Sequence, residues 1–262
     1  MSRPAYPWLT AALKVCRRGV PARLRARARQ WMFQWLDLTW TTRSRVHLRV
    51  AHFGEWILYN EIFVNGEYDH ALALALDAPR EAGSPLQIVD LGANIGYFTL
   101  RAVDRLLDRG LGLESVTITA FEANEAHVRE YESRVLHDNG LAPCVRLVHG
   151  LVGERSGTAA FHRDRIDGGH GGVGVQLPYV DLSPVLAQVP RIDVLKCDIE
   201  GSEQRLIENY PDILRKTRVA VFELHRDRCD TERCRALLRE YGFTHAATLR
   251  KGAAFSVCTV WR

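Results

Sequence analysis

From residue 86 to the end of the chain, short apolar runs alternate with amphipathic segments. Apolar runs of strand length occupy residues 86–92, 116–122, 145–150, 158–162, 192–201 and 218–225. Segments with helical periodicity occupy residues 96–108, 126–140, 203–215 and 231–242, the third interrupted at Pro211. This alternation predicts a doubly wound α/β fold with a mostly parallel sheet. The last two runs, 243–248 and 255–261, have no helix between them and predict an antiparallel edge strand.

The first 80 residues follow a different pattern. Residues 1–45 predict helices, in which Trp31 and Trp35 lie one turn apart and share a face. Residues 46–53 alternate in polarity and predict a strand, and the chain then passes a turn at Asn65-Gly66 into a helix over 68–77. We therefore divide the chain into a helical N-terminal extension with a lead-in, 1–80, and an α/β domain, 81–262.

Charge supports the same division. Hydrophobic residues make up 47% and charged residues 25% of the 262 residues, which excludes a disordered or fibrous chain. The formal net charge of +4 combines a value of +10 for residues 1–50 with −6 for the remainder. The basic head therefore needs an explanation separate from that of the acidic body.

Cysteine usage and hydropathy bear on the compartment. The six cysteines form no C-x-x-C pair, so we expect them to be buried thiols in a reducing compartment, the cytoplasm. No run of 18 apolar residues predicts a membrane-spanning helix. The apolar start of the chain is broken by Lys14 and followed by arginines rather than by a cleavage site, so we do not expect secretion.

A glycine turn joins the first buried strand to its helix. Gly92, Asn94 and Gly96 follow Asp90 there, and Glu122 ends the next strand. We expect Gly92 to let the backbone pass close to a ligand and Gly96 to let the helix pack tightly or open cleanly. Ligands of doubly wound folds bind at this edge, and an acid in the position of Glu122 accepts hydrogen bonds from ribose hydroxyls. The spacing departs from the three-glycine pattern of dinucleotide sites, and Asp90 would repel a pyrophosphate. These electrostatics favour S-adenosylmethionine, which carries a sulfonium and an ammonium group, over NAD.

Three segments together resemble the FkbM-type methyltransferases. They are Val89-Asp90-Leu91-Gly92-Ala93-Asn94-Ile95-Gly96, Phe121-Glu122-Ala123-Asn124 and Leu195-Lys196-Cys197-Asp198-Ile199-Glu200-Gly201-Ser202-Glu203; residues 62–68 resemble the lead-in of the family. The resemblance implies a Rossmann-like class I methyltransferase domain that uses S-adenosylmethionine, typically to methylate hydroxyls of natural products, sugars or glycans. Ala123 replaces a proline usual in the family, which should alter only the turn near the adenosine. After the third strand, His149-Gly150-Leu151 replaces the usual Asn-x-Ala, so the adenine pocket is expected to differ.

Positions in this fold assign the cofactor site. We expect Asp90, Gly92, Asn94 and Gly96 at the methionine end and Glu122 at the ribose. Asn124 and the backbone of Gly150 and Leu151 are expected to border the adenine.

The candidate catalytic residues are Asp198, Glu200, Glu223 and His225, which follow or end two adjacent strands. Glu223 and His225 are two residues apart on one strand and point to the same side. A hydroxyl acceptor must lose its proton, so His225 is a candidate base. Alternatively, Asp198, Glu223 and His225 bind a divalent metal ion that acidifies the hydroxyl, or they are structural. Glu203 favours the N-terminus of its helix electrostatically.

The sequence leaves several candidate substrates and binding partners open. The glycine-rich run 167–174 predicts a flexible loop, in which His170 is a candidate substrate residue if the loop closes as a lid. Residues 1–45 are candidates for a cap over the substrate site, a peripheral membrane contact that would suit a lipid-linked substrate, or a homo-oligomer interface. Nucleic acid is disfavoured because the body is acidic and no Pro-Pro-Tyr base-flipping motif follows the fourth strand. O-methylation is favoured over N-methylation.

Overall fold

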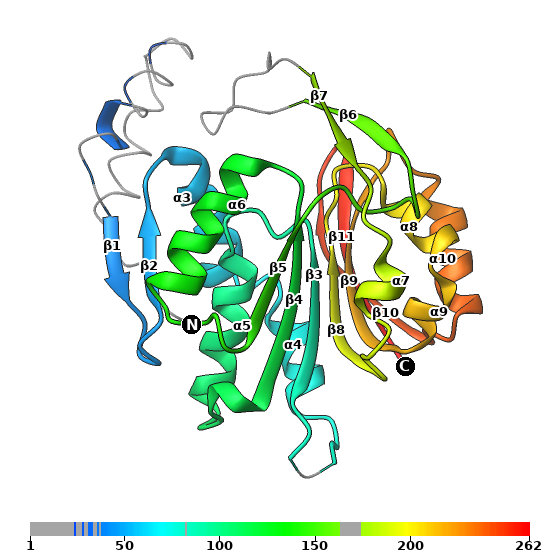
Figure 1. The fold of residues 1–262 in the computed structure, drawn as a ribbon, viewed down its shortest axis with the longest axis horizontal. Coiled ribbons are helices and arrows are strands. Elements are labelled where there is room, and N and C mark those ends of the chain that lie inside the picture. The colour runs from blue at the N-terminus through cyan, green and yellow to red at the C-terminus, as the bar shows by residue number, and fades with distance from the viewer. Residues whose placement is uncertain are drawn as a thin grey trace.

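The computed structural model describes residues 38–81, 83–162 and 174–262, together with residues 24, 28, 31–33 and 36. A seven-stranded sheet with the order β10-β11-β9-β8-β3-β4-β5 forms its centre (Figure 1). The strands are β3 (Leu86–Leu91), β4 (Val116–Glu122), β5 (Val145–His149), β8 (Ile192–Cys197), β9 (Thr217–His225), β10 (His245–Lys251) and β11 (Phe255–Trp261). Five of them are parallel, and β11 pairs antiparallel with β9 and β10. The predicted fold and its antiparallel edge are confirmed.

Helices cover both faces of this sheet, as Figure 1 shows. One face carries α4 (Asp69–Leu76), α5 (Tyr97–Asp108) and α6 (Glu125–Tyr131), and the other carries α7 (Leu182–Val185), α8 (Glu203–Asn209), α9 (Pro211–Arg215) and α10 (Thr231–Glu240). Successive strand residues enter opposite cores, because Ile88 packs in one hydrophobic cluster and Val89 in the other. Burial on both faces explains why these strands are continuous apolar runs.

The observed boundaries of several helices and strands differ from the predicted ones. The helix expected over 126–140 is α6 followed by a π-helical turn, η3 (Glu132–His137), and the strand expected over 192–201 ends at Cys197. Pro211 separates α8 from α9, where it takes the first helical position. A short 3-10 helix, η2 (Leu113–Ser115), precedes β4.

The structure of the residues before the sheet domain differs from one expectation. Residues 38–41, expected to be helical, form strand β1 (Leu38–Thr41), which pairs antiparallel with β2 (His47–Val50). Leu38 is buried and Trp40 partly buried, whereas the β-branched Thr39 and Thr41 are exposed, an alternation that suits a strand. Helix α3 (Phe53–Tyr59) and the π-helical turn η1 (Asn60–Val64) follow, and neither was predicted.

A buried ion pair fastens the lead-in to the sheet domain. Arg134 of η3 binds Glu55 of α3 at 2.9 Å and donates to the carbonyl of Arg49 at 3.1 Å. Side chains from Phe33 to Leu76 share one hydrophobic cluster with α5. The division of the chain at residue 80 stays a prediction.

Two expectations concern segments that are wholly or mostly undescribed. Strands β6 (Thr158–His162) and β7 (Gly174–Pro178) form a separate hairpin, and His170 lies between them, outside the described residues. Most of residues 1–35 also lie outside them; Trp31, Met32 and Phe33 are helical, as predicted. None of the helices in the described ranges is both long enough and apolar enough to cross a bilayer.

The five described cysteines are buried and free, as expected.

Candidate active site

The glycine turn packs directly against the loop that follows β8. Gly92 has a φ of +76°, and a Cβ there would lie 1.8 Å from the carbonyl oxygen of Asp198. The close approach that requires glycine is thus between two loops, whereas the sequence had indicated an approach to a ligand. Gly96 has a φ of +95°, and its Cβ would lie 2.3 Å from Cγ2 of Val135, so it allows tight helix packing as predicted.

Asp90 lies beneath this turn. It has 0% exposure, and its carboxylate lies 3.3 Å from Nζ of Lys196 and accepts a hydrogen bond from Thr99. Burial raises the pKa of Asp90, and Lys196 opposes this shift. The ammonium of Lys196 also donates to the carbonyl of Gly92 at 2.5 Å. Asp90 therefore has an internal cation as its partner, which weakens the argument that its charge is reserved for a cationic ligand.

Glu122 joins the loops after β3 and β4. Its two carboxylate oxygens accept the backbone N–H groups of Asn94 and Asn124, each at 2.7 Å. Burial raises the pKa of Glu122, but the hydrogen bonds from His127 and from these backbone groups lower it overall. A charged carboxylate is thus held where the ribose is expected. Asn94 takes the left-handed conformation, with a φ of +52°, to present its N–H.

The residues expected near the adenine have structural partners. Asn124 caps α6 by accepting the N–H of Ala126 at 3.0 Å, and it is buried. The N–H of Gly150 donates to the carbonyl of Glu122. The N–H of Leu151 donates to the carbonyl of Pro178 at the end of β7, and its carbonyl accepts the N–H of Val180. Any contact of Leu151 with adenine would therefore rely on its side chain or on the second lone pair of its carbonyl.

The candidate catalytic residues come together at the carboxyl edge of β8 and β9. Nε2 of His225 lies 3.4 Å from a carboxylate oxygen of Glu200 and 3.9 Å from one of Glu223. One donor atom each of Asp198, Glu200 and His225 lies within 4.8 Å of the others, a spacing that suits a divalent metal ion. The close set therefore contains Glu200, where the sequence had proposed Glu223.

Glu203 has a larger role than its sequence position indicated. Its side chain is fully buried and accepts the N–H groups of Ile199 and Gly201, at 3.1 and 3.0 Å. It also lies 3.2 Å from Nδ1 of His225 and accepts a hydrogen bond from Cys229. Glu203 thus fixes both the turn that carries Glu200 and the orientation of the imidazole.

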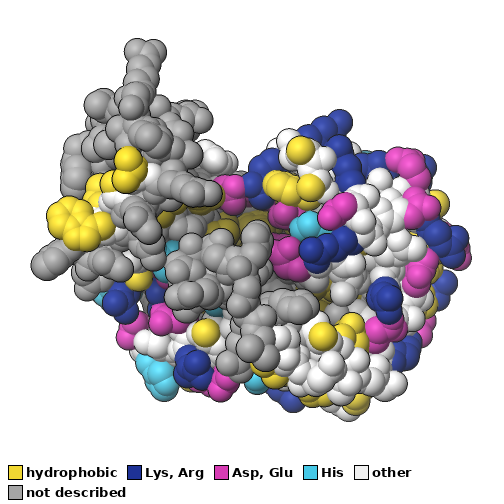
Figure 2. Space-filling model, turned by 90° about the horizontal axis from the view of Figure 1, so that it is seen from above, with side chains coloured by type: hydrophobic (Ala, Val, Ile, Leu, Met, Phe, Trp, Pro, Cys, Tyr) yellow, Lys and Arg dark blue, Asp and Glu magenta, His cyan; other side chains and the backbone are white. Residues whose placement is uncertain are grey.

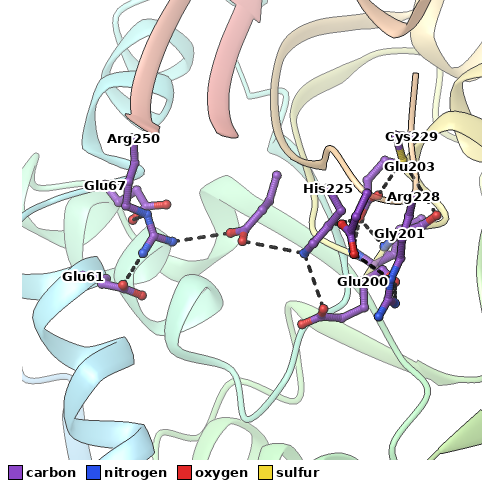
Figure 3. A network of polar contacts seen from close by, with 12 residues as sticks. Glu61, Glu67, Glu200, Gly201, Glu203, His225, Arg228, Cys229 and Arg250 are labelled. Carbon is purple, nitrogen blue, oxygen red and sulfur yellow. Dashed lines mark hydrogen bonds and ion pairs between the residues drawn. The ribbon is translucent and has the colours of Figure 1, made fainter. Parts of the chain in front are cut away.

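Three further charged residues adjoin this cluster, and sequence reasoning did not single them out. Arg250 of β10 forms ion pairs with Glu61 of η1, with Glu67 at 3.2 Å and with Glu223 at 3.5 Å. Figure 3 follows these contacts from Glu61 through Arg250 to His225. The register of β10 against β11 shifts between Thr248 and Arg250, as at a β-bulge. Glu67 lies in the lead-in that resembles the family, which was the available signal for it.

The titratable groups of this site have shifted pKa values. The hydrogen bond that the imidazole donates to Glu203 raises the pKa of His225 to about 9, against the opposing effect of burial, so the ring is protonated at neutral pH. Burial raises the pKa values of Glu67 and Glu223 to about 7. Burial also raises the pKa of Asp198, which Lys196 partly offsets. Figure 2 views this edge from above and shows acidic side chains around a hollow in the surface.

Comparisons with known proteins agree with this architecture. Residues 90–244 match the family described as the methyltransferase FkbM domain. A solved structure described as methyltransferase FkbM from Methylobacillus flagellatus superposes with a TM-score of 0.50 and 15% identity, covering 79% of this chain and 52% of that one. The structure of EvdMO1 superposes with a TM-score of 0.44 and 16% identity, covering 74% of this chain and 40% of that one. The METTL16 methyltransferase domain superposes with a TM-score of 0.47 and 12% identity, covering 92% of each chain.

The chain spans about half or less of the length of the first two of these structures. No protein of curated function showed a significant match to its sequence. The strand order and the glycine turn define a Rossmann-like class I methyltransferase fold. Within that class, the chain belongs to the FkbM methyltransferase family.

Proposed function

We propose that the protein transfers the methyl group of S-adenosylmethionine to a hydroxyl group of a small-molecule, natural-product or glycan acceptor. The observation that carries this proposal is the junction of the two loops at Gly92. The N–H of Asp198 donates to the carbonyl of Leu91 at 3.1 Å, so the acid cluster begins where the cofactor turn begins. A cofactor on that turn would present its methyl group beside Asp198 and His225.

The cofactor half would hold S-adenosylmethionine through fixed polar groups. Glu122 would accept hydrogen bonds from the ribose hydroxyls with the lone pairs that Asn94 and Asn124 leave free. The turn from Gly92 to Gly96 would border the methionine end, with Asp90 supporting it from below through Lys196. When bound, the cofactor supplies an electrophilic methyl group on a sulfonium.

The acceptor half would remove the proton of the hydroxyl. In the transfer, the acceptor oxygen forms a bond to the methyl carbon, the sulfur–carbon bond breaks with its electron pair left on sulfur, and the hydroxyl proton passes to a base. His225 is protonated at neutral pH, so it serves as that base only after it loses its own proton. Once the imidazole has lost that proton, Asp198, Glu200 and His225 would also hold a divalent ion, which would lower the pKa of a bound hydroxyl. We favour the metal-assisted alternative because three donors of suitable type already converge.

Calorimetric titration of the full chain with S-adenosylmethionine tests the proposal. We expect saturable binding, and we expect Glu122→Ala to weaken it by at least about tenfold, because hydrogen bonds to a charged group contribute about 1.5–3 kcal/mol. Glu132→Ala, at an exposed acid of η3, is the matched control and should bind as the wild type does. An absence of binding by the wild type would refute the proposed function; equal affinity of the Glu122 variant would refute the ribose assignment.

A further inference from the structure

The loop that joins β9 to α10 packs against the turn that follows β8. The N–H of Cys229 donates to the carbonyl of His225 at 2.8 Å, so the chain reverses directly after β9. The guanidinium of Arg228 donates to the carbonyl of Glu200 at 2.6 Å. The thiol of Cys229 lies 3.3 Å from Oε2 of Glu203. One loop thus contacts two acids of the neighbouring turn, beside His225, as Figure 3 shows.

The turn that this loop contacts is strained. Glu200 has a φ of +55°, in the left-handed region that residues with a side chain rarely adopt, and Gly201 follows with a φ of +100°. A Cβ at Gly201 would lie 2.2 Å from Cδ of Arg228, so the loop packs against the turn without space for a side chain. Strain of this kind persists only where the surroundings hold the backbone. The observed position of Glu200 therefore depends on groups outside its own turn.

Glu203 is the side chain through which these groups act. Its carboxylate is fully buried, and Oε1 accepts the N–H groups of Ile199 and Gly201 and the Nδ1–H of His225. Among the side chains that the structure describes, the Cys229 thiol is the one that donates to Oε2. The thiol also lies 3.8 Å from the carbonyl of Gly201, the longer of its two contacts. Because a buried carboxylate oxygen without a donor costs free energy, loss of the thiol would release one side of this carboxylate.

Both partners are in the protonation state that this hydrogen bond requires. Burial favours the neutral form of Glu203, but the hydrogen bonds from His225 and from the backbone of Gly201 lower its pKa overall. Burial raises the pKa of the Cys229 thiol to about 11, so the thiol keeps its proton at neutral pH. An ionised carboxylate only accepts hydrogen bonds, so the thiol is the donor. A hydrogen bond to an ionised acceptor is also stronger than one between neutral groups.

We propose that Cys229 is a positioning residue of the acceptor half: its thiol fixes the carboxylate of Glu203, and this carboxylate fixes the imidazole of His225. The thiol acts through Glu203 and not on the reacting atoms. This inference rests on the proposed function, because it assigns a further residue to the same acceptor half.

Imidazole NMR of the full chain, prepared with isotope-labelled histidine, tests this inference without cofactor or acceptor. We expect the wild type to show an Nδ1–H signal of His225, assigned by its absence from His225→Gln, that exchanges slowly with water because Glu203 holds the proton. In Cys229→Ala, Oε2 of Glu203 loses its donor, and we expect the Nδ1 proton to exchange at least about tenfold faster. Absence of this signal from the wild type, or equal exchange in the two proteins, would overturn the proposal.

Further variants separate positioning from packing. Cys229→Ser keeps a donor, and we expect its exchange rate to lie within about threefold of the wild-type value. Cys234→Ala removes another buried thiol of the same hydrophobic cluster and should leave the His225 signal unchanged. If Cys229→Ala does not fold, Cys229→Val, which removes the donor but fills the space, takes its place. Fast exchange in Cys234→Ala, or no recovery in Cys229→Ser, would show that the thiol serves packing alone and would contradict the assignment.

The cofactor half provides a separate measurement. We expect the affinity of Cys229→Ala for S-adenosylmethionine, measured by calorimetry, to stay within about twofold of the wild-type value, because the residues assigned to the cofactor are untouched. A large loss of this affinity would show that the substitution disturbs the whole site, and it would also count against a positioning role. Because the imidazole signal is recorded without cofactor, failure of this inference is distinguishable from failure of the proposed function.

Discussion

The two halves of the candidate site differ in how their polar groups are satisfied. On the cofactor side, Glu122 accepts two backbone N–H groups and Asp90 pairs with Lys196, so each charge has a partner fixed by the fold. On the acceptor side, several carboxylates crowd around two cations, Arg250 and His225. A buried carboxylate oxygen accepts no hydrogen bond from the described residues on either side: Oδ1 of Asp90 on the first and Oε1 of Glu67 on the second. The cofactor side thus holds its polar groups in a fixed arrangement, whereas the acceptor side concentrates charged groups.

This difference predicts opposite responses to substitution. Changes on the cofactor side should damage the fold along with function, because the same hydrogen bonds serve both. Changes on the acceptor side should alter proton binding, ion binding and selectivity with smaller effects on stability. Three substitutions test this contrast.

Gly92→Ala should have the largest effect. The new Cβ would collide with the carbonyl of Asp198 at a φ of +76°, so the turn and the β8 loop must separate. We expect a loss of about 3 kcal/mol or more in the free energy of unfolding, measured by urea denaturation, and loss of cofactor binding.

The matched control is Gly110→Ala. Gly110 has a similar φ of +73° but no atom within 4 Å of its Cβ position, so only conformational strain applies, about 1 kcal/mol. Equal destabilisation of the two variants would mean that the contact between the turn and Asp198 contributes nothing.

The sequence predicted the cofactor half well because its determinants are local. Gly92, Asn94 and Gly96 occupy one turn, and Glu122 ends the next strand, so motif and periodicity together placed them at one edge of the sheet. The physical reasons differed in part, since the contact that requires glycine at position 92 comes from a residue 106 positions later. A single sequence does not reveal such a neighbour.

The acceptor half was predicted only in part. Asp198, Glu223 and His225 lie at the ends of strands that the periodicity predicts to be adjacent, so their convergence followed from the fold class. Arg250 follows a register shift in β10, and Glu61 lies on a π-helical turn, and no sequence pattern indicated either feature. Convergence of elements this distant depends on tertiary packing, which local patterns do not encode.

The pH dependence of stability should show an intermediate effect. The hydrogen bond that the imidazole donates to Glu203 raises the pKa of His225 from 6.5 to about 9, so the folded protein binds this proton more tightly than the unfolded chain does. The resulting stabilisation is complete below the unfolded pKa of 6.5 and is lost as the pH rises through about 9.

We therefore expect the free energy of unfolding of the wild type to fall over this pH range by about 1–2 kcal/mol more than that of His225→Gln, since the ring is partly screened by solvent. Urea denaturation at several pH values measures the difference. His137→Gln, at an exposed histidine of η3, serves as the control. Parallel pH profiles for wild type and His225→Gln would show that the imidazole is not held as the structure indicates.

Glu200→Gln should have the smallest effect on the fold and so tests the contrast most directly. The Glu200 side chain is 80% exposed and its one ion pair is with His225, among the described residues, so we expect the free energy of unfolding to change by less than about 0.5 kcal/mol. Because the amide removes a charged oxygen from the set with Asp198 and His225, Mn²⁺ affinity, followed by electron paramagnetic resonance, should fall about tenfold or more. Cofactor affinity should stay within about twofold, because the residues assigned to the cofactor are untouched. With Glu240→Gln, at an exposed acid of α10, as the control, an unchanged Mn²⁺ affinity would remove the metal-assisted alternative, whereas a large loss of stability would show that charge on this side also supports the fold.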